Sequence, residues 1–385
     1  MDIRKIHDVF NAGGEPTVTY IKRDNHTKKL EEKISDELYS SKIIIIHGPS
    51  KLGKTVITKK VFSELEHIWV DGGTAKNALG LWDTIIMDAD DKFNTNRFQS
   101  RTDENAQIIG VNILKNKKLP LVIDDFHLMP EDEQKKIIQS VKSLVFNAIP
   151  IVLISVPHKL VDVVNAEREM NSRNIDIEIP TWEIEELEQI AIEGFKKLEL
   201  NNDKTMIDNF IRNSFGSPFI MQELCYKATI ASNESDFSAG KVTNPLVKTS
   251  ERMFYGEIAE SYCTDEFNWV LNGSKSHSTS RKEVEKTNGS KIDIFQAVTT
   301  GISMSKIDKP IIYLELKKNI MAILKDEPDN SRITYVLNKM TSLAKTLSSS
   351  SDVIRDPILE WDTDSKILYL IDPFLKFYIK WSGKY

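Results

Sequence analysis

Gly48-Pro49-Ser50-Lys51-Leu52-Gly53-Lys54-Thr55 matches the pattern G-x-x-x-x-G-K-[ST] at every position, and this stretch decides the fold. The β-branched apolar run before it, residues 42–47, is typical of a buried parallel strand. Apolar positions at helical spacing follow it in residues 56–65. A strand, a glycine-containing loop and a helix in this order predict a phosphate-binding loop, because backbone N–H groups and the helix N-terminus attract an anion.

The loop assigns roles to individual side chains. Lys54 is expected to contact the β and γ phosphates of a nucleotide, and the hydroxyl of Thr55 is expected to bind Mg²⁺. A chance match in a Gly/Lys loop is the alternative, and the flanking strand and helix argue against it. No Asn-Lys-x-Asp motif reads a guanine, so ATP is the expected nucleotide. The expected nucleotide-binding positions of this region are Gly48, Pro49, Ser50, Lys51, Leu52, Gly53, Lys54, Thr55 and Val56.

Composition limits the class of protein. A chain of 385 residues predicts two or three domains. The net charge of −6 argues against a protein that coats nucleic acid. The two cysteines, Cys225 and Cys263, favour a reducing compartment over a disulfide framework. There is no apolar signal core and no run of membrane-spanning length, so we expect a soluble, cytoplasmic protein with no membrane contact.

The chain divides into regions of different pattern. Between residues 42 and 180, short apolar strands alternate with helices, which predicts an α/β fold with a parallel sheet covered on both faces. We expect strands at residues 42–47, 67–71, 119–124, 149–155 and 175–179. Helices are expected at residues 131–146 and 159–170, and the polar stretch 89–102 is expected to be a surface excursion.

The second half of the chain is predominantly helical. Three helices are expected at residues 183–198, 204–213 and 219–230, followed by a linker at 232–250. Three more, at 292–304, 311–324 and 331–347, precede a Ser-rich turn at 348–351 and two strands at 358–361 and 367–371, which is the layout of a winged helix. The expected organisation is therefore a P-loop core (1–180), a helical lid (181–231), a linker (232–250) and a winged-helix-like domain (251–385).

Two acidic residues end the third expected strand. Asp124 is expected to organise Mg²⁺ through water, and Asp125 to polarise the attacking water. The alternative is that the acids only end a strand, and the upstream loop favours the catalytic interpretation. Ser155 would face the γ-phosphate if its strand lies between the phosphate-loop strand and the Asp124 strand. The alternative is that its hydroxyl only caps a strand end.

Two arginines, Arg168 and Arg173, precede the fifth expected strand. An arginine at this position can reach the nucleotide of a neighbouring subunit and stabilise charge in the transition state. Arg173 is favoured because it lies closer to the strand, and the alternative is an exposed helix arginine.

The motif GPSKLGKT, the strand LPLVIDDFH and the helical segment with Phe215-Gly216-Ser217-Pro218-Phe219 resemble the AAA+/STAND class of P-loop ATPases, in particular archaeal-type and origin-recognition-like ATPases. The resemblance implies that Asp125 is the catalytic acid, Ser155 the first sensor and Pro218 part of the lid turn over the nucleotide. It also implies that the segment with Tyr20 and Arg23 covers the base.

Two departures from that class favour a slow switch over a motor. Rapidly hydrolysing AAA+ enzymes usually have Glu where this chain has Asp125. They also often have an arginine in the lid turn, where this chain has Ser217-Pro218. A Gly-x-Pro lid turn resembles that of the STAND switch proteins. A shorter catalytic acid and a missing lid arginine both favour slow turnover, because phosphoryl transfer depends on positioned charges.

The C-terminal region leaves the partner open. Residues 251–385 contain nineteen Lys and Arg against nineteen Asp and Glu, which favours a protein contact over DNA. The candidate reading helix offers only Arg332, Lys339 and Lys345. The aromatic closing segment, residues 371–381, has helical spacing and predicts a buried terminal helix rather than a base-stacking platform.

We therefore expect an ATP- and Mg²⁺-dependent molecular switch that hydrolyses ATP slowly and controls its own assembly or a partner protein. The resemblance alone implies a setting such as prokaryotic defence, signalling or mobile-element control. A DNA-binding AAA+ ATPase of the initiator or transposition type is the alternative. A scaffold with structural nucleotide is the third hypothesis. The sequence does not name the trigger, the partner or the oligomeric state.

Overall fold

The structure, a computed structural model, describes residues 2–25, 28–49, 51–93, 103–155, 173–201, 203–232, 234–248, 250–262, 264–273, 283–350 and 357–384. The chain forms two compact units. Ile21–Thr181 form most of the first, the α/β unit. Met1–Tyr20, Trp182–Ser348 and Asp356–Tyr385 form the second, the helical unit.

A parallel five-stranded sheet is the centre of the α/β unit. Its strand order is β4 (Ile68–Asp71), β5 (Leu121–Asp124), β6 (Ile151–Ile154), β3 (Ile43–His47) and β7 (Asn174–Glu178). The five predicted strands are all present, with ends shifted by one or two residues. Because all the strands are parallel, their carboxyl ends lie at one edge of the sheet, where loop residues from different strands can meet.

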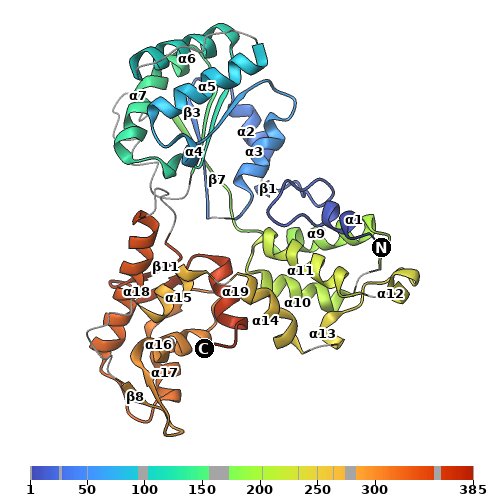
Figure 1. The fold of residues 1–385 in the computed structure, drawn as a ribbon, viewed down its shortest axis with the longest axis vertical. Coiled ribbons are helices and arrows are strands. Elements are labelled where there is room, and N and C mark those ends of the chain that lie inside the picture. Colours follow the sequence, from blue (N-terminus) through green and yellow to red (C-terminus); the bar gives the residue numbers. More distant parts are fainter. Residues whose placement is uncertain are drawn as a thin grey trace. The chain divides into compact units, whose positions relative to one another are not determined.

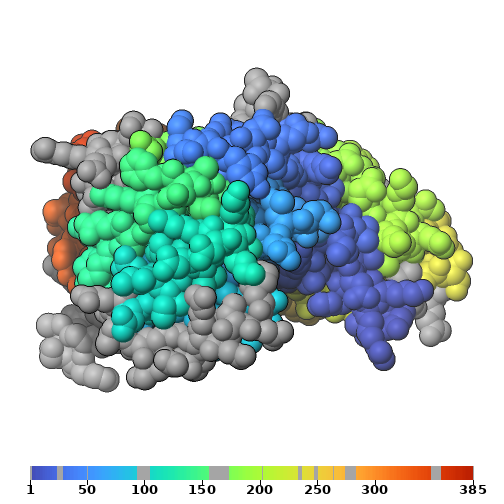
Figure 2. Space-filling model, turned by 90° about the horizontal axis from the view of Figure 1, so that it is seen from above, coloured from blue at the N-terminus to red at the C-terminus, as the bar shows by residue number. Residues whose placement is uncertain are grey.

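Helices cover both faces of this sheet (Figure 1). One face packs on α5 (Ala78–Phe93), α6 (Asp103–Lys117) and α7 (Glu131–Phe146), and the fully buried Trp82 belongs to that core. The outer sides of α6 and α7 form the teal and green surface of Figure 2. On the other face lie α2 (Leu30–Glu37) and α3 (Lys54–Phe62). Short elements complete the unit: β1 (Asp24–Asn25), β2 (Lys28–Lys29), α4 (Gly72–Ala75) and the 3₁₀ turn η1 (Phe126–Leu128).

One predicted segment of this unit differs from the structure, and one lies outside the described residues. The stretch 89–102 was expected to be a surface excursion, but residues 89–93 continue α5 and Ala89 is fully buried. Its apolar spacing extends that of the preceding helix, so a polar composition alone gave the wrong boundary. The helix expected at residues 159–170 lies outside the described residues.

The helical unit begins with a three-helix group formed by α9 (Ile184–Lys197), α10 (Lys204–Ser214) and α11 (Pro218–Ile230), which match the three predicted helices. The N-terminal helix α1 (Ile3–Val9) packs against α11. The first twenty residues thus belong with these helices. The region expected as a linker contains two short helices, α12 (Glu234–Ser238) and α13 (Pro245–Lys248).

The C-terminal part has the order helix, strand, helix, helix and hairpin. These are α16 (Ile294–Ser303), β10 (Ile311–Ile312), α17 (Tyr313–Ile323), α18 (Asn330–Ser350), β11 (Leu359–Asp362) and β12 (Ile367–Leu370). The strands form an antiparallel sheet in the order β10-β12-β11. The winged-helix assignment of this part stays a prediction. The Ser-rich turn expected from residue 348 is wrong for residues 348–350, which continue α18. Residue 351 lies outside the described part.

Further elements surround this group: α14 (Glu251–Ser261), α15 (Asp265–Asn272), the hairpin of β8 (Glu283–Glu285) and β9 (Lys291–Asp293), and the closing helix α19 (Pro373–Trp381). The prediction of a buried terminal helix is confirmed by α19, whose Phe377, Tyr378 and Ile379 are buried. Its rings reach into the rest of the unit. Tyr255 of α14 lies 4.5 Å from the Trp381 ring and 6.5 Å from the Phe210 ring of α10, measured between centroids.

Candidate nucleotide-binding site

The loop between β3 and α3 has the backbone geometry of an anion-binding turn. Lys51 has φ 66° and Gly53 has φ 90°, so the chain curls through the left-handed region twice. Gly48 has no room for a side chain, because a Cβ there would lie 2.5 Å from the carbonyl oxygen of Ile179, just after β7. Glycine therefore allows the loop to begin tight against the sheet. Ser50, an expected nucleotide contact, lies outside the described residues.

Lys54 folds back into its own loop. It is the first residue of α3, and its Nζ donates hydrogen bonds to the carbonyl oxygens of Gly48 at 2.8 Å and Pro49 at 3.0 Å. The residue is only 8 % exposed, so these carbonyls compensate a largely desolvated ammonium group. The positive charge is thereby held over the loop, as a contact to phosphate oxygens requires.

Thr55 and Asp124 meet across the sheet edge, as their predicted roles require. Asp124 ends β5, and its side chain is hydrogen-bonded to the Thr55 side chain and accepts from the Asp125 backbone N–H at 2.9 Å. Burial raises the pKa of the Asp124 carboxyl to about 6, with the charges of Asp125 and then Asp71 adding to the effect and the two hydrogen bonds opposing it. The two hydrogen bonds therefore do not fully compensate the cost of burying the ionised carboxylate.

These two oxygen ligands fit a magnesium ion. A carboxylate and a hydroxyl are hard oxygen donors, and the raised pKa marks a site where a cation would be stabilised. Among the described residues there is no cluster of three His, Cys, Asp or Glu side chains suited to a metal. Mg²⁺ usually takes only one or two protein ligands beside water and phosphate oxygens, so Thr55 and Asp124 are a sufficient set.

Asp125 begins a turn with unusual backbone geometry. Its φ of 49° lies in the left-handed region, which is uncommon for a non-glycine residue and directs its side chain differently from that of Asp124. The neighbouring α4 approaches this turn closely, since a Cβ on Gly72 would lie 2.6 Å from the Asp125 carbonyl oxygen. The turn is thus fixed by packing on backbone.

Asp71 is a member of the site that the sequence analysis did not single out. It ends β4 and pairs in register with Asp124 on the adjacent strand. Its side chain accepts from the Thr74 N–H at 2.6 Å, and its charge raises the pKa of Asp124. The sequence signal that could have identified Asp71 was an acidic residue at the last position of an expected strand.

Ser155 meets the condition set by the sequence analysis. Its strand, β6, lies between β3 and β5. Ser155 follows this strand, is fully buried, and donates its backbone N–H to the Ile46 carbonyl at 2.9 Å. The residue is therefore at the same sheet edge as Lys54, Thr55 and Asp124.

Arg173 lies at the end of the sheet where the strands begin, opposite to the phosphate loop. It directly precedes β7, whose first residue pairs with Ile43 at the start of β3. Its guanidinium carbon stands 4.1 Å from the centroid of the half-exposed Phe146 ring, a cation–π contact. Arg173 thus does not join the phosphate loop of its own chain, and a role in a neighbouring chain stays a prediction. Arg168 lies outside the described residues.

The two expected base-covering residues belong to different units. Arg23, in the α/β unit, is 4 % exposed and donates through Nη2 to the carbonyl oxygens of Pro180 and Thr181, both at 2.9 Å. It thereby ties the segment before α2 to the end of the unit. Tyr20 and the lid residue Pro218 belong to the helical unit.

The segment that leads to Tyr20 is fastened to the lid helix α11. The Gln222 Oε1 atom accepts from the Asn11 N–H at 3.0 Å and from the Thr19 hydroxyl at 2.9 Å. A Cβ on Gly13 would lie 2.7 Å from the Phe219 ring. Tyr20 and Pro218 are therefore carried by one packed body.

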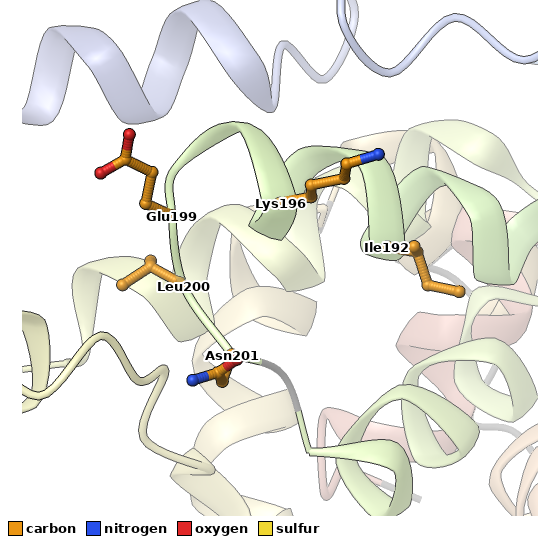
Figure 3. A pocket seen from close by; sticks show the side chains of 5 residues that line it. All are labelled: Ile192, Lys196, Glu199, Leu200 and Asn201. Carbon is orange, nitrogen blue, oxygen red and sulfur yellow. The ribbon is translucent and has the colours of Figure 1, made fainter.

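A separate depression occurs in the helical unit at the end of α9. It measures about 470 Å³ and is lined by Ile192, Lys196, Glu199, Leu200 and Asn201. Figure 3 shows these side chains pointing in different directions. No polar groups converge there as a small-molecule site requires. We therefore place the candidate site at the phosphate loop.

Neither models of protein families nor curated proteins gave a match to this chain. No helix in the described part of the chain has the length and apolar character needed to cross a membrane.

Solved structures do match. The ORC2 protein of Aeropyrum pernix, in its ADPNP–ADP complexes, superposes with a TM-score of 0.52 at 11 % identity, covering 94 % of this chain and 96 % of that one. A Walker-type ATPase of Pyrococcus abyssi gives a TM-score of 0.51 at 10 % identity, with 93 % and 96 % covered. The chain thus shares its fold with these two proteins along nearly its whole length.

Proposed function

We propose that this chain binds ATP with Mg²⁺ and hydrolyses it as an AAA+ ATPase of the origin-recognition type. The observation that supports this most is the meeting of Lys54, Thr55, Asp124, Asp125 and Ser155 at one edge of a sheet with the order β4-β5-β6-β3-β7. The structural neighbour from Aeropyrum pernix was solved with ADPNP and ADP, which fits nucleotide as the ligand of this fold.

Each residue has a distinct task in this proposal. Lys54 exchanges its two carbonyl contacts for phosphate oxygens, and the N–H groups of the loop and of the first turn of α3 surround the β-phosphate. Thr55 and Asp124 hold Mg²⁺, which when bound neutralises charge that develops on the phosphates. Asp125 orients and polarises the attacking water, and Ser155 donates a hydrogen bond toward the γ-phosphate.

Turnover is expected to be slow. Asp125 is one methylene shorter than the glutamate that rapidly hydrolysing AAA+ enzymes place there, and the lid turn offers Ser217 and Pro218 rather than an arginine. The shorter side chain sets the catalytic carboxylate further back, and the lid turn lacks a positive charge near the transferred phosphoryl group. Transition-state stabilisation by Arg173 of a neighbouring copy would depend on assembly, which makes the rate concentration-dependent.

The proposed nucleotide contacts are distributed over both compact units. The phosphate and Mg²⁺ ligands are on the α/β unit, and Tyr20 and Pro218 are on the helical unit. In the proposed switch, nucleotide binding and hydrolysis favour different conformations of the chain. Nucleotide state could in this way control the output of the C-terminal helices.

DNA is the partner that the fold comparison favours over a STAND-type protein partner. One neighbour that supports the fold is an ORC protein, and in the proposed winged helix α18 would be the helix that enters the major groove. Two of its three cations are already paired, however: Arg332 with Asp329 at 3.4 Å and Lys345 with Glu360 at 2.6 Å. Few phosphate contacts would be available, so a shallow salt dependence of DNA binding is expected.

ATP turnover with and without duplex DNA tests the proposal. Wild type and Asp125→Ala are compared at two salt concentrations, with assembly followed by light scattering. Binding of ATP by both proteins and turnover by wild type only is expected. DNA-stimulated turnover supports the initiator-type function, whereas slow, DNA-indifferent turnover with tightly held nucleotide supports a switch with a protein partner. Full activity of Asp125→Ala would remove this residue from the mechanism.

A further inference from the structure

The lid turn, residues 215–218 between α10 and α11, has a backbone that needs external support. Phe215 has φ 51° and Gly216 has φ 75°, so two successive residues are left-handed. Only one of them is a glycine, and the left-handed conformation is unfavourable for a phenylalanine. Ser217 follows fully buried, with its N–H donated to the Ser214 carbonyl at 2.9 Å. Neighbouring contacts must therefore hold this turn in place.

The closing helix α19 supplies contacts on the N-terminal side of the turn. Asn213, only 4 % exposed, accepts through Oδ1 from Lys380 Nζ at 2.9 Å and from Trp381 Nε1 at 3.1 Å. Its own amide group donates to the Asn209 carbonyl at 2.8 Å, which fixes the orientation of the acceptor. Lys380 Nζ also stands 5.6 Å from the centroid of the Phe215 ring, within cation–π range.

The same helix touches the C-terminal side of the turn. Phe374 meets Phe219 edge to face, with ring centroids 5.0 Å apart. Phe219 is the residue directly after Pro218, and it also packs against Gly13 of the segment that leads to Tyr20. One face of α19 thus contacts residues on both sides of the lid turn, and all of these contacts lie within the helical unit.

We propose that Lys380 and Trp381 are positioning residues for the lid turn, so that movement of α19 controls how firmly the protein retains its nucleotide. This inference rests on the proposed function for its consequence at the nucleotide, but not for the positioning itself. A ligand of the C-terminal helices that draws α19 away would release Asn213 and Phe215, and the turn would relax from its left-handed geometry. Nucleotide exchange would then accelerate without any change in the phosphate loop.

The test uses the full-length chain with the double substitution Lys380→Met and Trp381→Phe. These changes remove both donors to Asn213 while keeping an apolar stem and an aromatic ring. Lys384→Met is the matched control, because Lys384 follows the same helix and bonds the Tyr378 hydroxyl at 3.0 Å and Glu260 at 3.5 Å, away from the lid turn. Lys380→Arg retains a cationic donor and is expected to behave as wild type.

Hydrogen exchange of the Ser217 and Met221 amides is measured first, without nucleotide. Release of fluorescently labelled ADP is then followed by stopped flow. The double variant is expected to exchange at these amides about tenfold faster than wild type and the control, and to release ADP faster by a similar factor. Unchanged exchange, or equal acceleration in the control, overturns the positioning role.

The two proposals fail in different ways. Faster exchange with an unchanged ADP release rate overturns the link between α19 and nucleotide retention. If wild type binds no nucleotide at all, the proposed function is wrong, while the exchange comparison still decides whether α19 positions the turn.

Discussion

Replacing Asp124 by asparagine is expected to stabilise the nucleotide-free α/β unit at neutral pH. The Asp124 carboxyl is nearly fully buried, and its pKa is raised from 3.8 to about 6. A raised pKa means that folding favours the protonated form, so the ionised form destabilises the folded state at pH above 6. Two pKa units correspond to about 3 kcal/mol, which is the upper size of the effect.

Asparagine is a suitable replacement because it keeps the geometry. Its Oδ1 can still accept from the Asp125 N–H, the bond that spans 2.9 Å in the structure. The size of the effect depends on pH. As pH falls from about 6 toward 3.8, wild-type Asp124 takes up a proton in the folded state before the unfolded chain does. The folded wild type therefore gains stability over this range, and its difference from Asp124→Asn should shrink toward zero.

The assay is denaturation by urea in EDTA at pH 7.5 and pH 4.5, followed by hydrogen exchange of peptides covering the central strands of the sheet. Asp71→Asn serves as the control, since Asp71 is exposed and asparagine can still cap α4, and its effect should stay below about 1 kcal/mol. Destabilisation by Asp124→Asn at pH 7.5, or an equal effect at both pH values, would refute the reasoning. Hydrogen bonds of the carboxylate would then outweigh its burial.

Other consequences of the site can be checked separately. Lys54→Ala is expected to abolish ATP binding in calorimetry, and an unchanged affinity would exclude the phosphate-loop assignment. Gly48→Ala places a Cβ 2.5 Å from a backbone oxygen and should destabilise the α/β unit by at least about 2 kcal/mol. Gly53→Ala meets no atom within 4 Å and should cost only about 1 kcal/mol for its left-handed φ, so equal losses in urea denaturation would contradict this comparison. Cys225 is fully buried, and burial raises the pKa of its thiol. In a Cys263→Ser background, iodoacetamide should therefore label Cys225 only when the helical unit opens, and rapid labelling of the native protein would disprove this.

The sequence predicted those parts of the structure that depend on local pattern. The phosphate loop, the five strands and the Asp124 position follow from apolar runs that end in glycine or acid, and these signals span fewer than about ten residues. The lid helices and α19 follow from helical spacing in the same way. The position of Ser155 relative to the phosphate loop depends on the order of the strands. This order is not a local property, so the sequence predicted the position only as a condition.

What the sequence could not supply depends on contacts between distant residues. Asp71 and Asp124 are neighbours because two strands pair in register, although more than fifty residues separate them. Arg173 lies at the amino-terminal end of the strands, away from the phosphate loop, because it precedes β7 and β7 runs parallel to β3. The attachment of residues 1–20 to α11 rests on the Gln222 side chain, whose hydrogen-bonding role no periodicity reveals.

The contacts of α19 bear on how a nucleotide signal could travel through this protein. Tyr255 of α14 packs on Trp381 of α19, and Phe210 of α10 packs on Tyr255, so the lid helices and the C-terminal helices share one aromatic cluster. Burial of large rings contributes several kcal/mol per residue, which makes independent motion of lid and C-terminal helices costly. A ligand that draws α19 away from the lid turn must therefore offset the loss of these ring contacts as well as of the contacts at Asn213 and Phe219. A partner of the C-terminal helices could in this way change nucleotide retention without touching the phosphate loop.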